Sequence, residues 1–381
     1  MRLALTLGGG GARAAYQVGV LRTISRQHPD LQIDLLNGVS AGAINVSHLA
    51  SFEGNLRDSA DALADLWLDL RLRNVFRTQG YSLLWRLFRI GMRLSIGLPG
   101  FIEPVHGMVD TTPLRKYLCQ ALKTTDGTLP GIRRNLESGR LQGVALTANS
   151  YATGDTVSFF DGQKIDQWKR PNRRSVETSL HVDHIMASSS LPLFFPPVQI
   201  NNEWYGDGGI RLFAPLGPAV HMGASHVMVI STHFQNRARA TTNQHEAPSP
   251  ATVLAEMYNS MFLDQLDQDV RQMERTNLLL PHVEEPHRLG LREVGLLVLR
   301  PSQDLGELAF DLRNRLPPTL RYLLNRFGGS QSGSDDFLST LMFHPDYVQR
   351  LIEIGESDAA AHSEQIDAFL NQPVPGPQSA E

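Results

Sequence analysis

The sequence Gly-Val-Ser-Ala-Gly at residues 38–42 lies between a stretch with the character of a buried strand and one with the character of a helix. Residues 33–36 end in two leucines, and residues 41–52 combine small and apolar side chains. Small residues on both sides of a serine let a strand turn sharply into a helix and leave the hydroxyl group exposed at the turn. The stretch therefore predicts a strand–turn–helix unit with Ser40 as a candidate nucleophile. An ordinary turn of small residues is the alternative.

A glycine-rich loop precedes this unit in the chain. Residues 3–7 predict a short strand, residues 8–11 are four glycines, and a helix is expected from residue 14 to about residue 27. Backbone N–H groups in a loop of this kind have no partners within the segment, so they are available to stabilise a developing oxyanion. The neighbouring loop favours a catalytic serine over a chance match.

Strand and helix patterns alternate as far as about residue 300, which predicts an α/β fold with a mainly parallel central sheet. Two short strands flank Asn201-Asn202, where positive φ angles are tolerated, so a hairpin is expected to lead into Asp207. The other expected strands cover residues 143–148, 157–160, 227–231 and 294–299. The other expected helices include residues 55–69, 251–278, 305–314, 318–327, 335–342 and 345–370.

The composition limits the function classes that fit this chain. Its 381 residues are 41% apolar and 19% charged, with a formal net charge of -4, which is typical of a soluble globular protein and gives no case for nucleic-acid binding. The single cysteine, Cys119, excludes an intrachain disulfide. Neither a signal peptide nor a membrane-spanning stretch of about 18 apolar residues is evident. The expected location is therefore the cytoplasm, including the inner face of the membrane.

Residues 71–102 contain six arginines and no acidic residue. At helical spacing, apolar side chains fall on one side of this segment, while Arg86, Arg89 and Arg93 lie on the opposite side. A basic amphipathic segment of this kind suits the surface of an anionic bilayer. The other interpretation is a lid helix that packs on the domain and exposes its arginines to water, and the two interpretations are compatible.

Three motifs occur in the order in which they occur in patatin-like phospholipases, and together they resemble that family. They are Gly-Gly-Gly-Ala-Arg at residues 9–13, Gly-Val-Ser-Ala-Gly at residues 38–42 and Asp-Gly-Gly at residues 207–209. Residues 187–198 also resemble the stretch that precedes the Asp-Gly-Gly motif in bacterial members. One departure is Ala14, because the family more often has a glycine after the arginine of the first motif.

The resemblance implies a three-layer patatin-like sandwich with a mainly parallel sheet and a helical C-terminal region. It also implies a Ser–Asp dyad, in which Ser40 is the nucleophile and Asp207 its base. An aspartate with its ordinary pKa of about 3.9 is a weak base near pH 7, so the site must be partly desolvated or the pair tightly coupled. The supporting residues that the resemblance implies are Gly9, Gly10, Gly11 and Arg13 at the oxyanion hole, Gly38 and Gly42 at the elbow, and Gly208 and Gly209 beside the base.

The implied activity is hydrolysis of lipid acyl esters, of the phospholipase A or lysophospholipase type, without a metal or other cofactor. The expected partners are a phospholipid or other lipid ester and a membrane surface, and the oligomeric state is left open. The expected domains are a catalytic domain over residues 1–300 with the basic insertion at about 71–102, a helical C-terminal extension over 301–372 and a disordered tail over 373–381.

Several other functions compete with this interpretation. A histidine-based triad would share the elbow, but none of the thirteen histidines lies in a motif typical of a triad, and His181 and His184 lack a third residue for a metal site. The glycine loop lacks the Gly-Lys-Ser/Thr ending of a nucleotide-binding loop. Acyl transfer, general esterase activity and a non-catalytic membrane scaffold remain open as alternatives.

Overall fold

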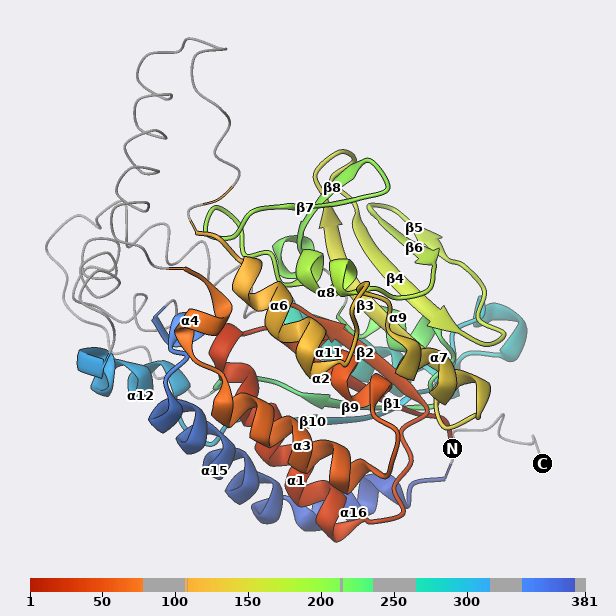
Figure 1. Cartoon of the computed structure of the whole chain (residues 1–381). Coiled ribbons are helices and arrows are strands. Elements are labelled where there is room, and N and C mark those ends of the chain that lie inside the picture. The colour runs from red at the N-terminus through yellow and green to blue at the C-terminus, as the bar shows by residue number, and fades with distance from the viewer. Residues whose placement is uncertain (78–106, 108, 213–214, 236–264, 316–337, 374–381) are drawn as a thin grey trace, which may run out of the picture.

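The computed structural model describes residues 1–77, 107, 109–212, 215–235, 265–315 and 338–373 (Figure 1). Most of the arginine-rich segment, including Arg86, Arg89 and Arg93, lies outside these residues. The expected helix at 318–327, the first half of the one at 251–278 and nearly all of the expected tail also lie outside them. No helix among the described residues is long and apolar enough to cross a membrane.

The centre of the molecule is a mixed, mainly parallel sheet, as the sequence predicts. Its parallel part has the order β10 (Gly295–Leu299), β9 (His226–Ile230), β1 (Leu3–Leu7), β2 (Leu35–Val39) and β3 (Gly143–Ser150). It continues through β4 (Thr156–Gly162), which is antiparallel to β3, then β6 (Arg173–Glu177) and β5 (Lys169–Arg170).

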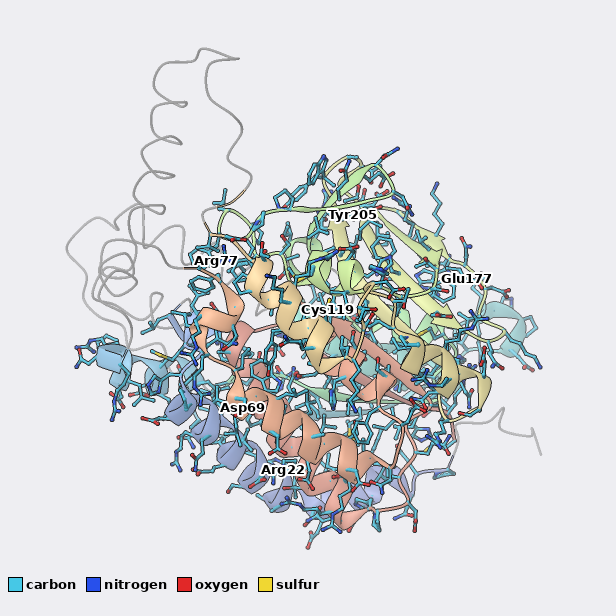
Figure 2. All side chains as sticks on the ribbon, viewed as in Figure 1. Arg22, Asp69, Arg77, Cys119, Glu177 and Tyr205 are labelled. Atoms are coloured by element: carbon cyan, nitrogen blue, oxygen red, sulfur yellow. The ribbon has the colours of Figure 1, made fainter. Side chains whose placement is uncertain are left out.

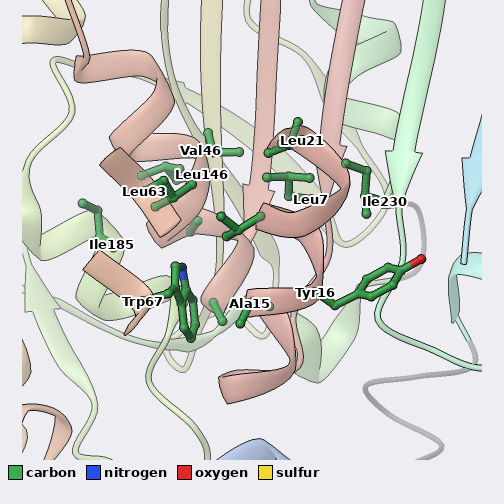
Figure 3. Close-up of a cluster of buried hydrophobic side chains, with 14 of the residues drawn as sticks. Leu7, Ala15, Tyr16, Leu21, Val46, Leu63, Trp67, Leu146, Ile185 and Ile230 are labelled. Carbon is green, nitrogen blue, oxygen red and sulfur yellow. The ribbon is translucent and has the colours of Figure 1, made fainter. Parts of the chain in front are cut away.

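Helices cover both faces of the sheet, so the fold has three layers (Figure 1). Successive side chains of β1 point to opposite faces of the sheet. Leu5 belongs to a core between the sheet and the helices that follow the elbow, whereas Ala4 belongs to a second core on the other face. The first core is packed by α1 (Ala15–Gln27), α2 (Ala41–Ser51), α3 (Leu56–Asp69) and α15 (Pro345–Ala361), and part of it is drawn in Figure 3. The second is packed by α9 (Gly217–His221) and α11 (Gln265–Leu279).

The remaining elements are short. They are η1 (Gly11–Ala14), α4 (Leu72–Val75), α6 (Thr112–Ala121), α7 (Pro130–Glu137), α8 (Val182–Ser188), β7 (Val198–Ile200), β8 (Glu203–Asp207), η2 (Gly208–Arg211), η3 (Leu280–His282), η4 (Glu285–His287), α12 (Leu305–Asp311), η5 (Arg313–Arg315) and α16 (Ser363–Leu370). The hairpin of β7 and β8 turns at Asn201 and Asn202, with φ angles of 46° and 66°, which confirms the expected turn.

The C-terminal helix expected over residues 345–370 is in fact two helices, so that prediction was wrong. The chain leaves helical geometry at His362, with φ -101° and ψ 17°, and the His362 imidazole bonds to the carbonyl of Asp358 at 2.8 Å. The break lets α16 turn so that Phe369 packs edge-on against His226, with 5.6 Å between ring centroids. A helical sequence pattern does not reveal such a tertiary contact.

Helix α15 crosses α1 at close range because each helix has a glycine at the crossing. A Cβ atom on Gly19 would lie 2.0 Å from the Ile352 carbonyl oxygen, and one on Gly355 would lie 2.2 Å from the Tyr16 carbonyl oxygen. Both distances are far below contact distance, so the two backbones pack without intervening side chains. The C-terminal region is thereby built into the first core.

We predict that Gly355→Ala lowers the free energy of unfolding by about 1–3 kcal/mol, because the added methyl group overpacks the crossing. Helix propensity alone would act in the opposite direction by up to about 1 kcal/mol. Chemical denaturation measures the difference. Glu353→Ala on the exposed face of α15 is the matched control and should change stability by less than about 0.5 kcal/mol. Equal stability of Gly355→Ala and the wild type would contradict the close crossing.

Candidate active site

Two strands meet end to end on one edge of β3. Strand β2 runs along that edge as far as the pair Val39–Thr147, and β8 arrives from the opposite direction and ends with the pair Asp207–Ala148. The other edge of β3 is occupied by β4 along almost its whole length. Ser40, which follows Val39, and Asp207 are therefore brought together by strand register. Tyr205, labelled in Figure 2, marks β8 two residues before Asp207.

Ser40 occupies the turn between β2 and α2 in a conformation unusual for a residue with a side chain. Its φ is 55° and its ψ is -129°, and the residue is 8% exposed. Such geometry costs on the order of 1–3 kcal/mol and persists only where the surroundings enforce it. The turn requires glycine at both flanking positions. A Cβ atom on Gly42 would lie 2.2 Å from the Leu7 carbonyl oxygen, and a Cβ atom on Gly38 would lie 2.7 Å from the Gly42 carbonyl oxygen, so a side chain at either position would clash with the backbone.

The Ser40 hydroxyl group donates a hydrogen bond of 2.6 Å to Oδ2 of Asp207. The other carboxylate oxygen accepts a hydrogen bond of 2.8 Å from the backbone N–H of Gly209. Gly208 lets this strand end approach β3, since a Cβ atom there would lie 2.2 Å from the Thr147 carbonyl oxygen. None of the hydrogen bonds described for Ser40 and Asp207 involves a histidine.

Asp207 is completely buried, and burial raises its pKa from 3.8 to about 7. The hydrogen bonds from Ser40 and from Gly209 act in the opposite direction but do not offset the loss of hydration. The site thus has the desolvation that an aspartate needs to act as a base near neutral pH.

The glycine loop passes directly beside Ser40. A Cβ atom on Gly9 would lie 2.9 Å from the Ser40 Cβ atom, and the Gly9 carbonyl accepts a 2.7 Å hydrogen bond from Thr232. In the described part of the chain, no hydrogen bond uses the backbone N–H groups of Gly9, Gly10 or Gly11 as donors. Arg13 is 2% exposed, and its backbone N–H closes the η1 turn by bonding to the Gly10 carbonyl at 3.1 Å.

Three consecutive serines at the C-terminal end of α8 tie the two strand ends together, and sequence reasoning missed their role. The Ser188 hydroxyl group accepts from the Ser40 N–H at 3.0 Å and donates to the Thr147 carbonyl at 2.6 Å. The Ser189 hydroxyl group donates to the Ser40 carbonyl at 3.2 Å, and the Ser190 carbonyl accepts from the Asp207 N–H at 3.0 Å. The only sequence signal was that Ser188 lies in the family-like stretch at 187–198.

An apolar pocket opens beside Ser40, between α2, α3 and α6. Its lining comprises Gly11, Ser40, Ala41, Ile44, His48, Leu63, Leu66, Trp67, Leu70, Val75, Leu114, Tyr117, Leu118, Ala121, Leu122, Ser189, Leu191, Phe195, Thr340, Leu341 and Phe343. The last three come from the C-terminal region, for which sequence reasoning expected no part in the site. Cys119, labelled on α6 in Figure 2, is half-buried and does not line the pocket.

The histidines singled out by spacing have structural contacts. His181 caps α8, and its Nε2 atom lies 2.9 Å from the Asp126 carbonyl oxygen. His184 Nδ1 accepts from the His181 N–H at 2.9 Å. Within the described ranges, no group of three or more potential metal ligands is present.

Comparison with known proteins finds one matching family model and several similar solved structures. The family model described as "Patatin-like phospholipase" matches residues 5–220. Curated protein sequences gave no match. Among solved structures, VipD from Legionella pneumophila is 11% identical with a TM-score of 0.37, covering 96% of this chain and 67% of VipD. Human GIVD cytosolic phospholipase A2 in complex with methyl gamma-linolenyl fluorophosphonate is 13% identical with a TM-score of 0.46, covering 97% of this chain. The chain spans only 58% of that human structure.

The buried carboxyl group of Asp207 has a consequence for stability. Between its unfolded pKa near 3.8 and its folded pKa near 7, the folded state keeps a proton that the unfolded state releases, so stability falls as pH rises through this range. One pKa unit corresponds to about 1.4 kcal/mol. We therefore expect the free energy of unfolding of Asp207→Asn, relative to that of the wild type, to increase by roughly 4 kcal/mol as the pH rises from about 4 to about 8. Urea denaturation of both proteins at several pH values measures this difference. A difference that stays constant with pH would contradict the raised pKa.

Proposed function

Because this chain belongs to the patatin-like phospholipase family, we propose that it is a lipid acyl hydrolase with Ser40 as nucleophile and Asp207 as general base. The single observation that carries the assignment is the 2.6 Å hydrogen bond from the Ser40 hydroxyl group to a fully buried carboxylate. A serine hydroxyl group at its ordinary pKa is a weak nucleophile and needs a base within hydrogen-bond distance. Asp207 meets that requirement.

In the proposed reaction, Ser40 Oγ attacks the ester carbonyl carbon while its proton passes to Asp207. The N–H groups of Gly9, Gly10 and Gly11 stabilise the resulting oxyanion. Collapse of the tetrahedral intermediate breaks the ester C–O bond, and the departing alcohol takes the proton from Asp207. Water then attacks the acyl-enzyme, gives a proton to Asp207 and releases the fatty acid, after which that proton returns to Ser40.

The apolar pocket beside Ser40 supports a lipid substrate over a small polar ester. Its walls are mainly leucine and aromatic side chains, which favour a hydrocarbon chain by roughly 0.8 kcal/mol for each buried methylene group. We therefore place the acyl chain in this pocket and the leaving alcohol outside it, as in phospholipase A or lysophospholipase chemistry. Acyl transfer to another alcohol would use the same acyl-enzyme. A general esterase would hydrolyse esters without a preference for lipid, and a non-catalytic membrane scaffold would hydrolyse none.

Peripheral membrane contact also belongs to the proposal. Its support is the sequence of residues 71–102, where arginines on one helical face would contribute on the order of 1 kcal/mol each near anionic lipid. A phospholipase must draw its substrate from a bilayer, so such contact would raise the local substrate concentration.

We expect Ser40→Ala to remove essentially all release of fatty acid from a panel of phospholipids and lysophospholipids, measured by mass spectrometry. The same change should abolish labelling by a fluorophosphonate probe, because the alanine lacks the hydroxyl group that attacks phosphorus. Ser47→Ala, a buried serine on α2 that does not line the pocket, is the matched control and should still be labelled. Persistent labelling of Ser40→Ala would assign the nucleophile elsewhere, and labelling without release of fatty acid from any lipid would favour the general esterase.

The pH dependence tests the role of Asp207. Only the charged carboxylate accepts the Ser40 proton, so kcat/KM should rise with pH through about 7 and level off above it. Asp207→Asn should lower kcat by roughly three to five orders of magnitude, because the base is lost while the shape is kept. His48→Gln and other single histidine changes should leave the rate of a short ester within about tenfold. A histidine variant as inactive as Asp207→Asn but normally folded would establish a histidine base instead.

A further inference from the structure

The apolar pocket follows one face of helix α2 away from Ser40. Its lining residues on that helix include Ile44 and His48, spaced four and eight residues from Ser40. Residues four apart lie above one another on one helix face, and eight residues correspond to about 12 Å of helix at 1.5 Å per residue. His48 is the lining residue of α2 that lies farthest from the candidate nucleophile.

His48 lines this pocket and contacts two residues that line a second cavity. That cavity is lined by Phe52 and Ser59, among other residues. The His48 Nε2 atom lies 3.2 Å from the Ser59 carbonyl oxygen, and the His48 and Phe52 rings pack with 5.7 Å between centroids. The imidazole therefore contacts the apolar pocket on one side and two residues of the second cavity on the other.

The His48 ring is held in place and fits an apolar surface. Because a carbonyl oxygen only accepts hydrogen bonds, Nε2 must carry the hydrogen in the contact with Ser59. The side chain is 7% exposed, and burial, with a further effect from Lys123, lowers its pKa to about 4. The imidazole is consequently neutral at physiological pH, so the end of the pocket carries no charge that would repel a hydrocarbon chain.

We propose that His48 is a specificity-determining residue, which closes the acyl-chain pocket and limits the chain that fits between Ser40 and the imidazole to about ten carbons. The limit follows from the length of about 12 Å of helix between Ser40 and His48. An extended polypeptide advances at most about 3.6 Å over the three backbone bonds of one residue, so an extended chain of single bonds advances about 1.2 Å per bond. This inference rests on the proposed function, because it takes the pocket as the site of the acyl chain. Longer chains are disfavoured because they must bend back or leave methylene groups in water.

The test is a series of p-nitrophenyl esters with acyl chains of 4 to 16 carbons, each assayed below its micelle-forming concentration. For the wild type, kcat/KM should rise to a maximum near ten carbons. His48→Ala opens the pocket toward the second cavity and should move the maximum to longer chains by at least two carbons. Ile44→Phe narrows the pocket about 6 Å from Ser40 and should move the maximum to about five carbons.

Two further variants complete the design. Leu49→Ala enlarges only the second cavity, which Leu49 lines, and should leave the chain-length profile unchanged. His48→Gln keeps an N–H donor for the Ser59 carbonyl in a side chain without a ring, so it should lengthen the preferred chain even if His48→Ala fails to fold. Labelling by a fluorophosphonate probe checks that each variant keeps a competent Ser40.

The outcomes separate the two proposals. If the wild type hydrolyses the esters in a Ser40-dependent manner but neither His48 variant changes the profile, His48 does not set the chain length. A maximum that moves equally with Leu49→Ala would also overturn this role, because that change leaves the imidazole in place. If Ser40→Ala hydrolyses the series as fast as the wild type, the proposed nucleophile fails instead.

Discussion

The geometry of the candidate site depends on the edge of strand β3, which two strands share end to end. The Val39–Thr147 and Asp207–Ala148 pairs are adjacent in register, so the strand ends that carry Ser40 and Asp207 meet at one point of the sheet. A slip of one residue in the register of β8 would turn the Asp207 carboxylate to the opposite face. The hydrogen bonds of Ser188, Ser189 and Ser190 hold the same junction from the side of α8. Both groups are thus positioned by backbone pairing in the central sheet and by these hydrogen bonds, which preorganise the short contact between them.

Burial has two opposing effects at this junction. The complete exclusion of water from Asp207 makes its carboxylate a stronger base than an exposed aspartate, and the same exclusion destabilises the folded state once that carboxylate is charged. The strained φ of Ser40 adds a second local cost. The surrounding core, including the close crossing of α1 and α15 at Gly19 and Gly355, offsets both. The stability of the surrounding core therefore allows the fold to keep a site that is locally unfavourable.

Sequence reasoning succeeded where local chemistry determines the structure. The Asn201-Asn202 turn is a local property, and the structure confirms it. The structure also places Ser40 beside Asp207 and Gly9, the residues that the three motifs selected. The break at His362, the role of the three serines and the pocket wall at residues 340–343 were missed, because each depends on contacts between segments far apart in the chain. The expected membrane contact of Arg86, Arg89 and Arg93 stays a prediction, since these residues lie outside the described ranges.

A buried chain of hydrogen bonds connects the apolar pocket to the glycine loop. The indole N–H of Trp67, in the pocket wall, donates to Asn45 at 2.7 Å, and Asn45 in turn donates to Gln17 at 2.9 Å. Gln17 donates to the Gly8 carbonyl at 2.9 Å, and both Asn45 and Gln17 are fully buried. Unpaired amide groups at such depth would be costly, so this network favours one position of the loop relative to the pocket wall. Trp67 also stacks on Phe343, with 6.4 Å between ring centroids. Through this contact, the C-terminal region of the chain is coupled to the loop that faces Ser40. The family-like motifs, which all lie before residue 210, give no indication of this coupling.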